Sequence, residues 1–513
     1  MVKNEMDLLI GIDVGTSGLK AVAVDERGTV VARAMREYPL HLPGPGWTEQ
    51  EPEDWWAAAV SALQDITSRL NPESIAGIGL TGQMHGSVFL DVNGEVIRPA
   101  ILWNDQRTVA ECQEITERIG QENLINLAGS PALTGFTAPK ILWLRNHEPH
   151  NFRRLFRVIL PKDYIRFRLT GVLATDVADG SGTLLLDVPD RRWSRTILDR
   201  LGLSEDILPE LFESTAVTGR VTETAARLTG LPVGTPVVAG GGDQAVSAVG
   251  MGVVEEGMAS VSLGTSGVVF AATDRPLVHP GGRVHTFCHA VPGKWHVMGV
   301  MLSAGGSLRW LRDRLFSEET AVAGRIGLDP YELITAQAQR VGIGAEGLLF
   351  LPYLTGERTP HADPWARSCF IGLSLNHDKA HLARAAMEGI TMGLKDSLEL
   401  LRELGIYGGE IRITGGGAGS PLWRQVLADA FASPLRRMEL NEGAAFGAAV
   451  LAAVGVGLYG EVASACREMV RVGEPVEFSQ TRAACYEQLY VLYREAYIRL
   501  KEIFPNLRQF DKK

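Results

Sequence analysis

A single carboxylate behind three glycines is the residue best suited to chemistry in this sequence. Asp243 follows the run Pro236 to Gly242, in which an apolar stretch typical of a strand leads into three glycines. The small residues from Ala245 to Val249 predict a helix directly behind it. Asp243 would therefore stand at the carboxyl end of a strand, where open α/β folds place their ligands. The simpler alternative is that Asp243 only caps the helix.

A glycine motif occurs twice, on either side of this segment. Gly15-Thr16-Ser17-Gly18 follows the apolar run Leu8 to Val14, and Gly264-Thr265-Ser266-Gly267 follows the run Ala259 to Leu263. Each turn leads into a further apolar run, so the whole strand-turn-strand frame is repeated. The repeat predicts two domains of similar build. The copies differ at one informative position, where Asp13 in the first corresponds to Ser262 in the second.

The two turns are candidates for binding phosphate. Inward-pointing backbone N–H groups of tight turns form anion-binding concavities, and the Thr and Ser hydroxyls add donors. A facing pair of turns could hold the phosphates of a nucleotide between two domains. Asp13 would then bind Mg²⁺ directly or through water, because magnesium prefers oxygen ligands. Either turn alone could be an ordinary hairpin; the pair, together with Asp13 and Asp243, favours a nucleotide site.

Other phosphate-binding motifs do not fit. The pattern G-x-x-x-x-G-K-[ST] is absent, which excludes a P-loop. The pattern G-x-G-x-x-G begins at Gly77, Gly342 and Gly455, but none of the three lies between a strand and a helix. We therefore expect no dinucleotide fingerprint.

Polar residues end two further predicted strands, and glycines end a third. Ile75 to Leu80 leads into Thr81-Gly82-Gln83-Met84-His85-Gly86, and Val96 to Trp103 leads into Asn104-Asp105-Gln106-Arg107. Both ends could hydrogen-bond a polyhydroxylated ligand. The alternatives are that Met84 and His85 belong to the core and that Asn104 and Asp105 cap a helix. The strand Glu410 to Thr414 ends in Gly415-Gly416-Gly417, where a flat ring could approach the backbone.

Composition narrows the class of protein. The 513 residues carry a formal net charge of −10 with 45% hydrophobic content, as in globular proteins, and no basic run long enough for nucleic acid. The five scattered cysteines lack a C-x-x-C pair, which predicts reduced thiols rather than disulfides or a zinc site. Neither a signal-peptide pattern nor a membrane-spanning run is visible. We expect a cytoplasmic enzyme with no nucleic-acid or membrane partner.

The chain resembles the FGGY family of carbohydrate kinases from Ile10 to about Gly460. Besides the two hairpins, the resemblance is carried by Gly135 to Trp143 and by the segment from Phe370 to Glu388. Within the family the similarity is strongest to the xylulose kinase branch. It is indicated by four segments: Gly82 to Gly86, Trp103-Asn104-Asp105, Leu160 to Tyr164 and Gly356-Glu357-Arg358-Thr359-Pro360-His361.

The resemblance implies an α/β fold with two ribonuclease-H-like domains, of the actin and sugar-kinase type, on either side of a catalytic cleft. We expect the N-terminal domain at 1–250 and the C-terminal domain at 251–513. The implied reaction is phosphorylation of D-xylulose to D-xylulose 5-phosphate by ATP with Mg²⁺. The alternatives are another sugar or polyol, such as ribulose, gluconate or glycerol, or a non-catalytic nucleotide-responsive scaffold. Retention of Asp13 and Asp243 argues against the scaffold.

The resemblance also implies roles for residues. Asp243 matches the catalytic base and Asp13 the carboxylate near magnesium and the phosphates. The expected substrate-binding residues are Gln83, Met84, His85, Trp103, Asn104, Asp105, Asp243 and Gln244. The expected nucleotide-binding residues are Gly15, Thr16, Ser17, Gly264, Thr265, Ser266, Gly415, Gly416 and Gly417. Gln244 departs from the Asn of close relatives, keeping an amide on a longer arm.

Several residues keep two interpretations. Arg358 either binds substrate or pairs with an acid such as Asp363. His285, Cys288 and His289 resemble a ligand cluster, but alternation along a strand favours core packing. The helix predicted at 482–503 could form a homodimer contact or pack within the chain.

Overall fold

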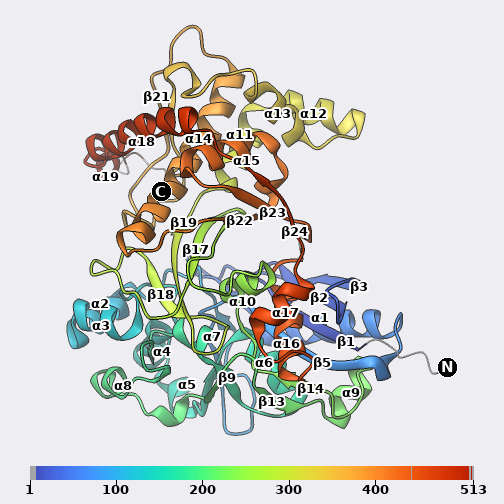
Figure 1. The fold of residues 1–513 in the computed structure, drawn as a ribbon. Helices are drawn as coiled ribbons and strands as arrows, with labels where there is room; N and C mark the ends of the chain where they lie inside the picture. The colour runs from blue at the N-terminus through green and yellow to red at the C-terminus, as the bar shows by residue number, and fades with distance from the viewer. Residues whose placement is uncertain (1–6, 441, 508–509, 511–513) are drawn as a thin grey trace, which may run out of the picture.

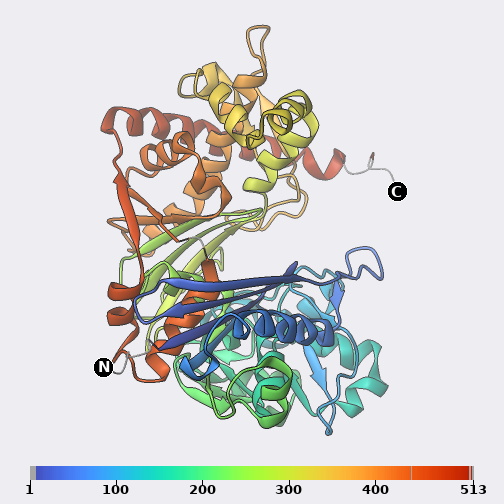
Figure 2. The same cartoon turned by 90° about the vertical axis from the view of Figure 1, so that its right-hand side faces the viewer.

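The computed structural model describes residues 7–440, 442–507 and 510, and it consists of two lobes, each built on one large sheet (Figure 1, Figure 2). The first sheet has the order β13-β14-β5-β1-β2-β3, with β15 also paired to β5. Strands β1, β2 and β3 are antiparallel neighbours, whereas β5 runs parallel to β1 and β14 parallel to β5. The strands are β1 (Leu8–Val14), β2 (Gly18–Asp25), β3 (Val30–Glu37), β5 (Ile75–Gly82), β13 (Val217–Arg220), β14 (Pro236–Val238) and β15 (Gly241–Gly242).

The second sheet repeats this arrangement. Its order is β18-β19-β17-β16-β22-β23-β24, in which β16, β17 and β19 are antiparallel and β22 and β23 continue parallel to β16. The prediction of two related α/β domains is therefore confirmed. The strands are β16 (Ala259–Leu263), β17 (Gly267–Thr273), β18 (His285–Cys288), β19 (Trp295–Met301), β22 (Ile411–Thr414), β23 (Leu435–Met438) and β24 (Val472–Val476).

Helices cover both sheets, and local sequence accounts for their ends. α1 (Pro52–Thr67) begins with a proline and two acids, which suit a helix amino terminus, and buries Trp55 and Leu63 against β2 and β3. α14 (Lys379–Glu403) is closed at its start by a capping box from Asp378. The remaining N-lobe helices are α2 (Val109–Ile119), α3 (Gln121–Ala128), α4 (Thr137–His147), α5 (Pro149–Arg154), α6 (Pro161–Thr170), α7 (Val177–Ser181), α8 (Arg195–Leu201), α9 (Glu223–Thr229) and α10 (Asp243–Gly250).

The C-terminal half contributes helices to both lobes. They are α11 (Gly305–Leu315), α12 (Ser317–Ile326), α13 (Pro330–Ala338), α15 (Pro421–Phe431), α16 (Gly443–Gly455), α17 (Val462–Met469), α18 (Gln480–Leu500) and α19 (Phe504–Leu507). Short strands complete the chain: β4 (Glu49–Gln50), β6 (Val88–Leu90), β7 (Ala100–Ile101), β8 (Arg157–Ile159), β9 (Ala174–Asp176), β10 (Leu186–Asp187), β11 (Arg192–Trp193), β12 (Glu210–Phe212), β20 (Leu349–Leu351) and β21 (Cys369–Ile371).

One helix from the end of the chain packs in the first lobe. α16 lies against β1, β5 and α10, and in Figure 1 it appears in orange-red within the mainly blue and green lobe. The approach is close because glycines line it: a Cβ on Gly11 would lie 1.8 Å from the Ala445 carbonyl oxygen, and one on Gly79 would lie 1.9 Å from that of Ala448. A helix that the sequence assigns to the second domain thus covers the first sheet.

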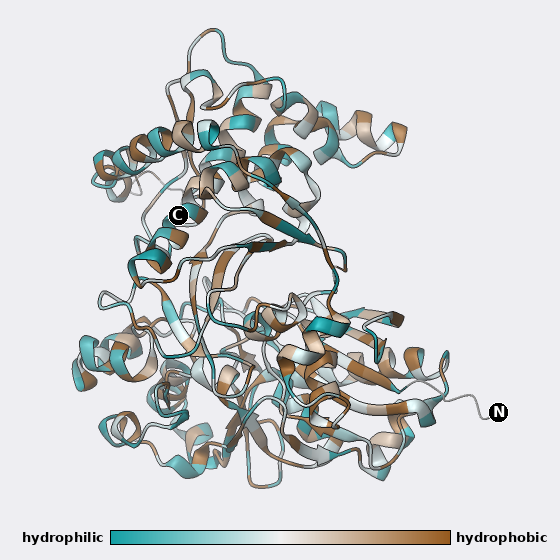
Figure 3. Ribbon diagram, viewed as in Figure 1, coloured by the Kyte–Doolittle hydropathy of each residue, from teal (hydrophilic) through white to brown (hydrophobic). Residues whose placement is uncertain are grey.

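The distribution of hydropathy follows the layers. The strands of the two sheets are mainly brown or white in Figure 3, whereas peripheral helices carry much of the teal. All residues of β1 except Asp13 are buried. Among the described residues, no helix combines the length and apolar character needed to span a bilayer. The five cysteines are free thiols, as predicted.

Candidate active site

Asp13 and Asp243 stand at the same end of the first sheet. Asp13 is in register with Thr81 on the neighbouring strand β5, and Gly241 of β15 is in register with Thr81 from the other side. Asp243 follows β15 directly and is the first residue of α10. The three-glycine run is needed here because a Cβ on Gly240, whose φ is +72°, would lie 1.8 Å from the Leu80 carbonyl oxygen. The glycines thus let Asp243 approach the β1–β5 edge.

Both carboxyl groups have raised pKa values in a poorly hydrated site. Burial, followed by the negative charge of Asp13, raises the pKa of Asp243 to about 7. Burial raises the pKa of Asp13 to about 6, an effect that the Lys20 ammonium reduces. The Lys20 Nζ is also 2.5 Å from Glu442 Oε2, next to the start of α16. A carboxylate pair of this kind is typical of a functional site.

Asp13 fits the requirements of a magnesium ligand. Its Oδ1 is buried and has no hydrogen-bond partner among the described residues. Within the described chain, no three His, Cys, Asp or Glu residues form a group that could hold a metal on their own. A cation here would therefore need oxygens from a bound phosphate chain and from water, which is how Mg²⁺ is usually held.

The first glycine turn is fixed by a polar chain that reaches the predicted sugar-binding residues. The Thr16 hydroxyl donates to Gln83 Oε1 at 3.0 Å and accepts from the Trp103 indole N–H at 2.9 Å. The Gln83 amide donates to Gln50 Oε1 at 3.0 Å, and the Gln50 amide donates to the Thr16 carbonyl at 2.8 Å. Gln83 is thus buried and engaged in positioning the turn rather than open to a ligand.

Met84 and His85 lie beside Asp243. A Cβ on Gly242, the residue before Asp243, would lie 2.7 Å from Met84 Cγ. His85 adopts a φ of +69°, and its Nδ1 is 2.6 Å from the Gly182 carbonyl oxygen, so Nδ1 carries the proton and Nε2 is left as an acceptor. Burial lowers the pKa of His85 to about 3, which keeps the ring neutral. His85 is half-buried rather than a fully buried core residue.

Lys140 ties Trp103 and His85 together. Its ammonium donates to the carbonyl oxygens of His85 at 2.8 Å and Gly135 at 2.7 Å. A Cβ on Gly135 would lie 2.3 Å from the Trp103 carbonyl oxygen, so the two segments are in direct contact. We call Met84, His85, Trp103, Asn104 and Asp243 the acceptor cluster. Gln244 adjoins it, with its amide 3.4 Å from Asp243 Oδ1.

An aromatic wall adjoins His85 and was not predicted from the sequence. The Phe136 ring centroid lies 4.5 Å from that of His85 and 6.1 Å from that of Phe287. Phe287 belongs to β18, a strand of the second sheet, so both lobes contribute to the wall. His285 stacks on Phe287 at 5.6 Å and its Nδ1 is 2.9 Å from Ser130 Oγ, which supports the core-packing interpretation. The segment around Phe136 was noted, but no local pattern indicates which distant ring it meets.

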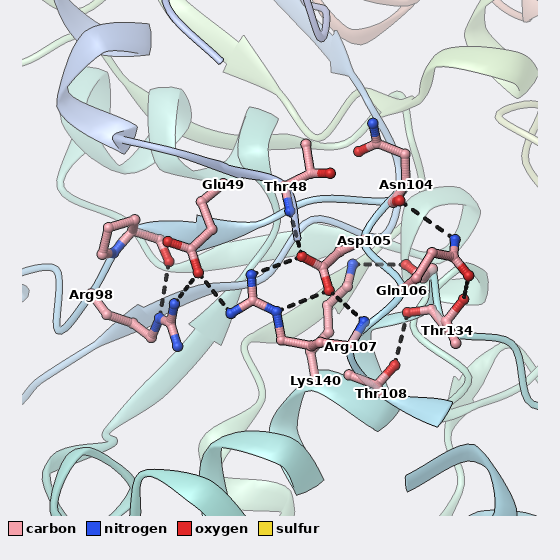
Figure 4. A network of polar contacts seen from close by, with 12 residues as sticks. Thr48, Glu49, Arg98, Asn104, Asp105, Gln106, Arg107, Thr108, Thr134 and Lys140 are labelled. Carbon is pink, nitrogen blue, oxygen red and sulfur yellow. Dashed lines mark hydrogen bonds and ion pairs between the residues drawn. The ribbon is translucent and has the colours of Figure 1, made fainter. Parts of the chain in front are cut away.

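Asp105 is placed differently from its neighbours. Its carboxylate accepts hydrogen bonds from the Arg107 side chain at 2.9 and 2.7 Å, from the Arg107 backbone N–H at 2.9 Å, and from the Thr48 N–H at 2.6 Å. Arg107 also pairs with Glu49 at 2.7 Å, and Glu49 pairs with Arg98 (Figure 4). Asp105 is fully buried. Its carboxylate is therefore engaged within the protein, and its contact with substrate stays a prediction.

Asn104 remains available. Its Oδ1 is buried and has no partner among the described residues, and it lies beside the network that fixes Asp105 (Figure 4). The ion pairs of Asp105 and Glu49 thus hold the loop that carries Trp103 and Asn104. Buried charge networks of this type hold a loop in one arrangement because every charge needs its partner.

A cavity of about 750 Å³ lies in the second lobe beside the second glycine turn. Gly264 and Thr265 line one side, and Gly416, Gly417 and Trp423 another. Of the predicted glycines, Gly415 lies beneath, where a Cβ would meet the Leu263 carbonyl oxygen at 2.5 Å. Ser266 and the first turn are not among the lining residues. Residues that the sequence did not indicate complete the wall: Gly305, Leu308, Arg309, Asp329, Tyr331, Glu332, Thr335, Ala336, Gln339, Gly419, Ser420 and Pro421.

Both glycine turns offer backbone donors. α11 holds the second turn, because the N–H groups of Gly305 and Gly306 donate to the carbonyls of Gly264 and Thr265, each at 2.9 Å. In each turn, the N–H groups of the central Thr and Ser have no acceptor within the described parts of the chain. Two free N–H groups at a tight turn suit an anionic oxygen.

Comparison with known proteins shows the family to which the chain belongs. The model for the N-terminal domain of the FGGY family of carbohydrate kinases matches residues 8–250, and that for the C-terminal domain matches residues 259–456. The chain is 43% identical over 448 residues to the xylulose kinase of Escherichia coli (strain K12), covering 87% of this chain and 90% of the relative. It is 33% identical to the gluconokinase of Bacillus subtilis (strain 168), covering 86% of each. The crystal structure of a xyloylose kinase from Brucella ovis has a TM-score of 0.88 at 36% identity, covering 97% of this chain and 100% of that one.

Proposed function

Because this chain belongs to the FGGY family of carbohydrate kinases, we propose that it transfers the γ-phosphoryl group of ATP to D-xylulose, forming D-xylulose 5-phosphate. The observation that carries the proposal is the Asp13–Asp243 pair at one end of the first sheet, beside the acceptor cluster. The similarity to xylulose kinases over most of the chain supports the choice of sugar.

Asp243 is the general base. It is half-buried next to Met84, so a sugar hydroxyl could lie within hydrogen-bonding distance of its carboxylate. As that oxygen bonds to the phosphorus and the bond to ADP breaks, Asp243 accepts the hydroxyl proton. Phosphoryl transfer depends mainly on positioning and on neutralising charge, so a modest base in a dry site suffices.

Asp13 and the glycine turns serve the phosphates. The unpartnered oxygen of Asp13 would hold Mg²⁺, either directly or by way of a water molecule. The ion would neutralise charge on the phosphate oxygens. The cavity in the second lobe would bind the adenosine, with Gly416 and Gly417 leaving room for a flat base. The turn residues Thr16, Ser17, Thr265 and Ser266 would donate backbone N–H groups to the phosphates once the lobes close.

The other members of the acceptor cluster orient the sugar. His85 Nε2 can accept a hydrogen bond from a sugar hydroxyl, Asn104 offers an Oδ1 that has no partner among the described residues, and Trp103 could present an aromatic face. Gln244 could contact the hydroxyl bound by Asp243. Asp105 would support the loop that carries Trp103 and Asn104, and Gln83 would support the first glycine turn.

The test is the Asp243→Asn variant in an assay of ADP release over D-xylulose, ribulose, glycerol and gluconate. We expect at least a 10²-fold loss of kcat for D-xylulose, because general bases typically contribute about 10²–10⁴-fold. ATP binding, measured by calorimetry, should persist. Asp199→Asn, an exposed acid on α8, is the matched control and should keep full activity.

Two outcomes would count against the proposal. Substantial sugar phosphorylation by Asp243→Asn would refute the role of this carboxylate. Wild-type turnover that does not depend on any sugar would refute the kinase reaction. The resemblance to a gluconokinase makes gluconate the second candidate, and a higher kcat/KM for gluconate than for D-xylulose would favour it.

A further inference from the structure

Arg358 is a cation without an ionic partner in the interior of the molecule. Its guanidinium makes no hydrogen bond or ion pair with any described residue, although the residue is only partly exposed. The acid that could have paired with it is engaged elsewhere, because the Asp363 carboxylate accepts from the Trp365 N–H at 2.8 Å and the Tyr497 hydroxyl at 2.9 Å. Burial lowers the pKa of Arg358, an effect that only the charge of Glu357 opposes. A guanidinium presents five donors, so leaving it unpaired is unfavourable unless a ligand uses it.

The backbone on both sides of Arg358 is held firmly. Glu357 Oε1 accepts from the N–H groups of Leu302 at 2.9 Å and Arg358 at 2.8 Å. The Thr359 N–H donates to the Val300 carbonyl at 3.1 Å, and the Thr359 hydroxyl donates to the Arg283 carbonyl at 3.2 Å. The loop that carries Arg358 is thus hydrogen-bonded to the end of β19 and lies beside the segment that leads into β18. A rigid support is what a binding group requires.

This position points Arg358 toward the acceptor cluster. The Thr359 hydroxyl bonds the Arg283 carbonyl, two positions before His285, and the His85 ring centroid lies 6.5 Å from that of Phe287 on the same strand, so the loop that carries Arg358 lies beside both rings. The positive charge of Arg358 also contributes to lowering the pKa of His85 and His285. These rings belong to the aromatic wall to which both lobes contribute. The loop of Arg358 therefore adjoins the His85 part of the acceptor cluster.

We propose that Arg358, from the second lobe, binds the oxygens at the ketone end of the sugar, O1 and O2, while Asp243 holds the hydroxyl to be phosphorylated. This rests on the proposed function, in which the 5-hydroxyl lies at Asp243. A five-carbon chain extended from Asp243 past Met84 brings its ketone end toward His85 and Arg358. The guanidinium can donate to two neighbouring oxygens at once, which an ammonium cannot do with the same geometry. The sugar then links the two lobes, so Arg358 is a specificity-determining residue that couples sugar binding to closure.

The test combines Arg358→Gln with a sugar that lacks one of the proposed oxygens. We expect kcat/KM for D-xylulose to fall roughly 10–100-fold, the range for a hydrogen bond to a charged group. For 1-deoxy-D-xylulose, which lacks O1, the same substitution should cost several-fold less. The KM for ATP and the affinity for ADP with Mg²⁺, measured by calorimetry, should change less than about twofold. Arg358→Lys, which keeps the charge, should recover only part of the loss.

Controls separate this inference from the proposed function. Arg325→Gln, an exposed arginine on α12, should leave all parameters unchanged, and melting temperatures verify that the variants are folded. If wild type phosphorylates D-xylulose and Arg358→Gln matches it, the role of Arg358 is refuted while the kinase reaction stands. Equal losses on the two sugars would refute the assignment to the ketone end. If wild type phosphorylates no sugar, the proposed function and this inference both fail.

Discussion

Asp105 is a polar residue near the proposed binding site whose carboxylate is bound by other residues of the protein. Its four hydrogen bonds come from Arg107 and Thr48, and Arg107 in turn lies over the Trp47 ring with its Cζ 3.9 Å from the centroid. The ion pair is almost completely shielded from water, with side-chain exposures of 1% for both partners. Removing one partner of such a pair is costly because the other charge stays buried.

We predict that Asp105→Asn acts on stability more than on substrate affinity. The free energy of unfolding should fall by about 3 kcal/mol, since Arg107 would lose its main partner and keep only Glu49. At a temperature where the variant is folded, the KM for D-xylulose should change less than about threefold. Differential scanning calorimetry and steady-state kinetics measure the two effects. Asn104→Ala is the comparison, because it should raise KM with little loss of stability; a reversed pattern would assign Asp105 to the substrate.

The sequence predicts some of the site residues because they sit in local patterns. Asp13 and Asp243 stand beside glycine runs whose strand context can be read directly. Phe287 and the unpaired state of Arg358 could not be predicted, because each depends on contacts with segments far along the chain. The pairing of Asp105 with Thr48 could not be predicted for the same reason, because it spans 57 positions and leaves no local trace.

At the scale of elements, the contact of α16 with the first sheet depends on glycines. Gly11→Ala should lower the free energy of unfolding by about 1–3 kcal/mol, because the added methyl would meet the Ala445 carbonyl at 1.8 Å and force the helix away. Gly324→Ala is the control, since this exposed glycine within α12 has nothing within 4 Å of the added Cβ. That substitution should be neutral or stabilising, because alanine favours helix. Thermal melts of the two variants and of wild type test this prediction. Equal melting temperatures for Gly11→Ala and Gly324→Ala would contradict the packing argument.

The packing of α18 on α14 predicts a pH-dependent stability. Burial raises the pKa of Asp396 on α14 to about 7, although the Tyr490 hydroxyl of α18 donates to it at 2.6 Å. The folded protein therefore retains a proton that the unfolded chain has lost above pH 4. Its stabilising effect is complete below the ordinary pKa of Asp and disappears as the pH rises through about 7.

At high pH the buried, ionised Asp396 carboxylate lowers the stability of the folded protein, and Asp396→Asn removes this cost. We expect the variant to be more stable than wild type at pH 8, by at most about 4 kcal/mol in unfolding free energy, and this difference to fall to about 2 kcal/mol at pH 5. The amide keeps an oxygen that can accept from Tyr490. Melting temperatures of both proteins from pH 5 to pH 9 test this, with Asp199→Asn as an exposed control. A difference that does not vary with pH would show that Asp396 is not the titrating group.

The elements themselves were predictable to different degrees. The repeated hairpins indicated two related sheets, and the repeat of strand order confirms that they share one topology. The sequence could not predict that α16 packs on the first sheet, because a helix made only of Gly, Ala and other apolar residues has no polar face to show which side is covered. Its partner sheet lies more than 350 positions earlier in the chain.

At the scale of the whole molecule, the packing of α16 on the first sheet means that the two lobes are not independent folding units. α16 covers the face of β1 and β5, and the core that it shares with α10 and α17 contains Val22 and Val24 of the first sheet and Phe270 of the second. A fragment ending near residue 256 would leave that apolar face open to water. Exposed apolar surface of this extent favours association with other molecules.

We predict that residues 1–256 alone are aggregated or loosely folded, whereas the same fragment carrying residues 440–470 behind a short Gly-Ser linker folds cooperatively. The linker can be short because a Cβ on Gly250, at the end of α10, would lie 2.8 Å from the carbonyl oxygen of Gly443, at the start of α16. Size-exclusion chromatography, dye binding and thermal melts compare the two proteins. A third version with Gly447→Leu is the control: its side chain would meet the Val246 carbonyl oxygen, which is 1.9 Å from an added Cβ, so the rescue should be lost. A monomeric, cooperatively melting 1–256 fragment would instead show that the first sheet is stable without the helix, and that α16 only fastens the lobes together.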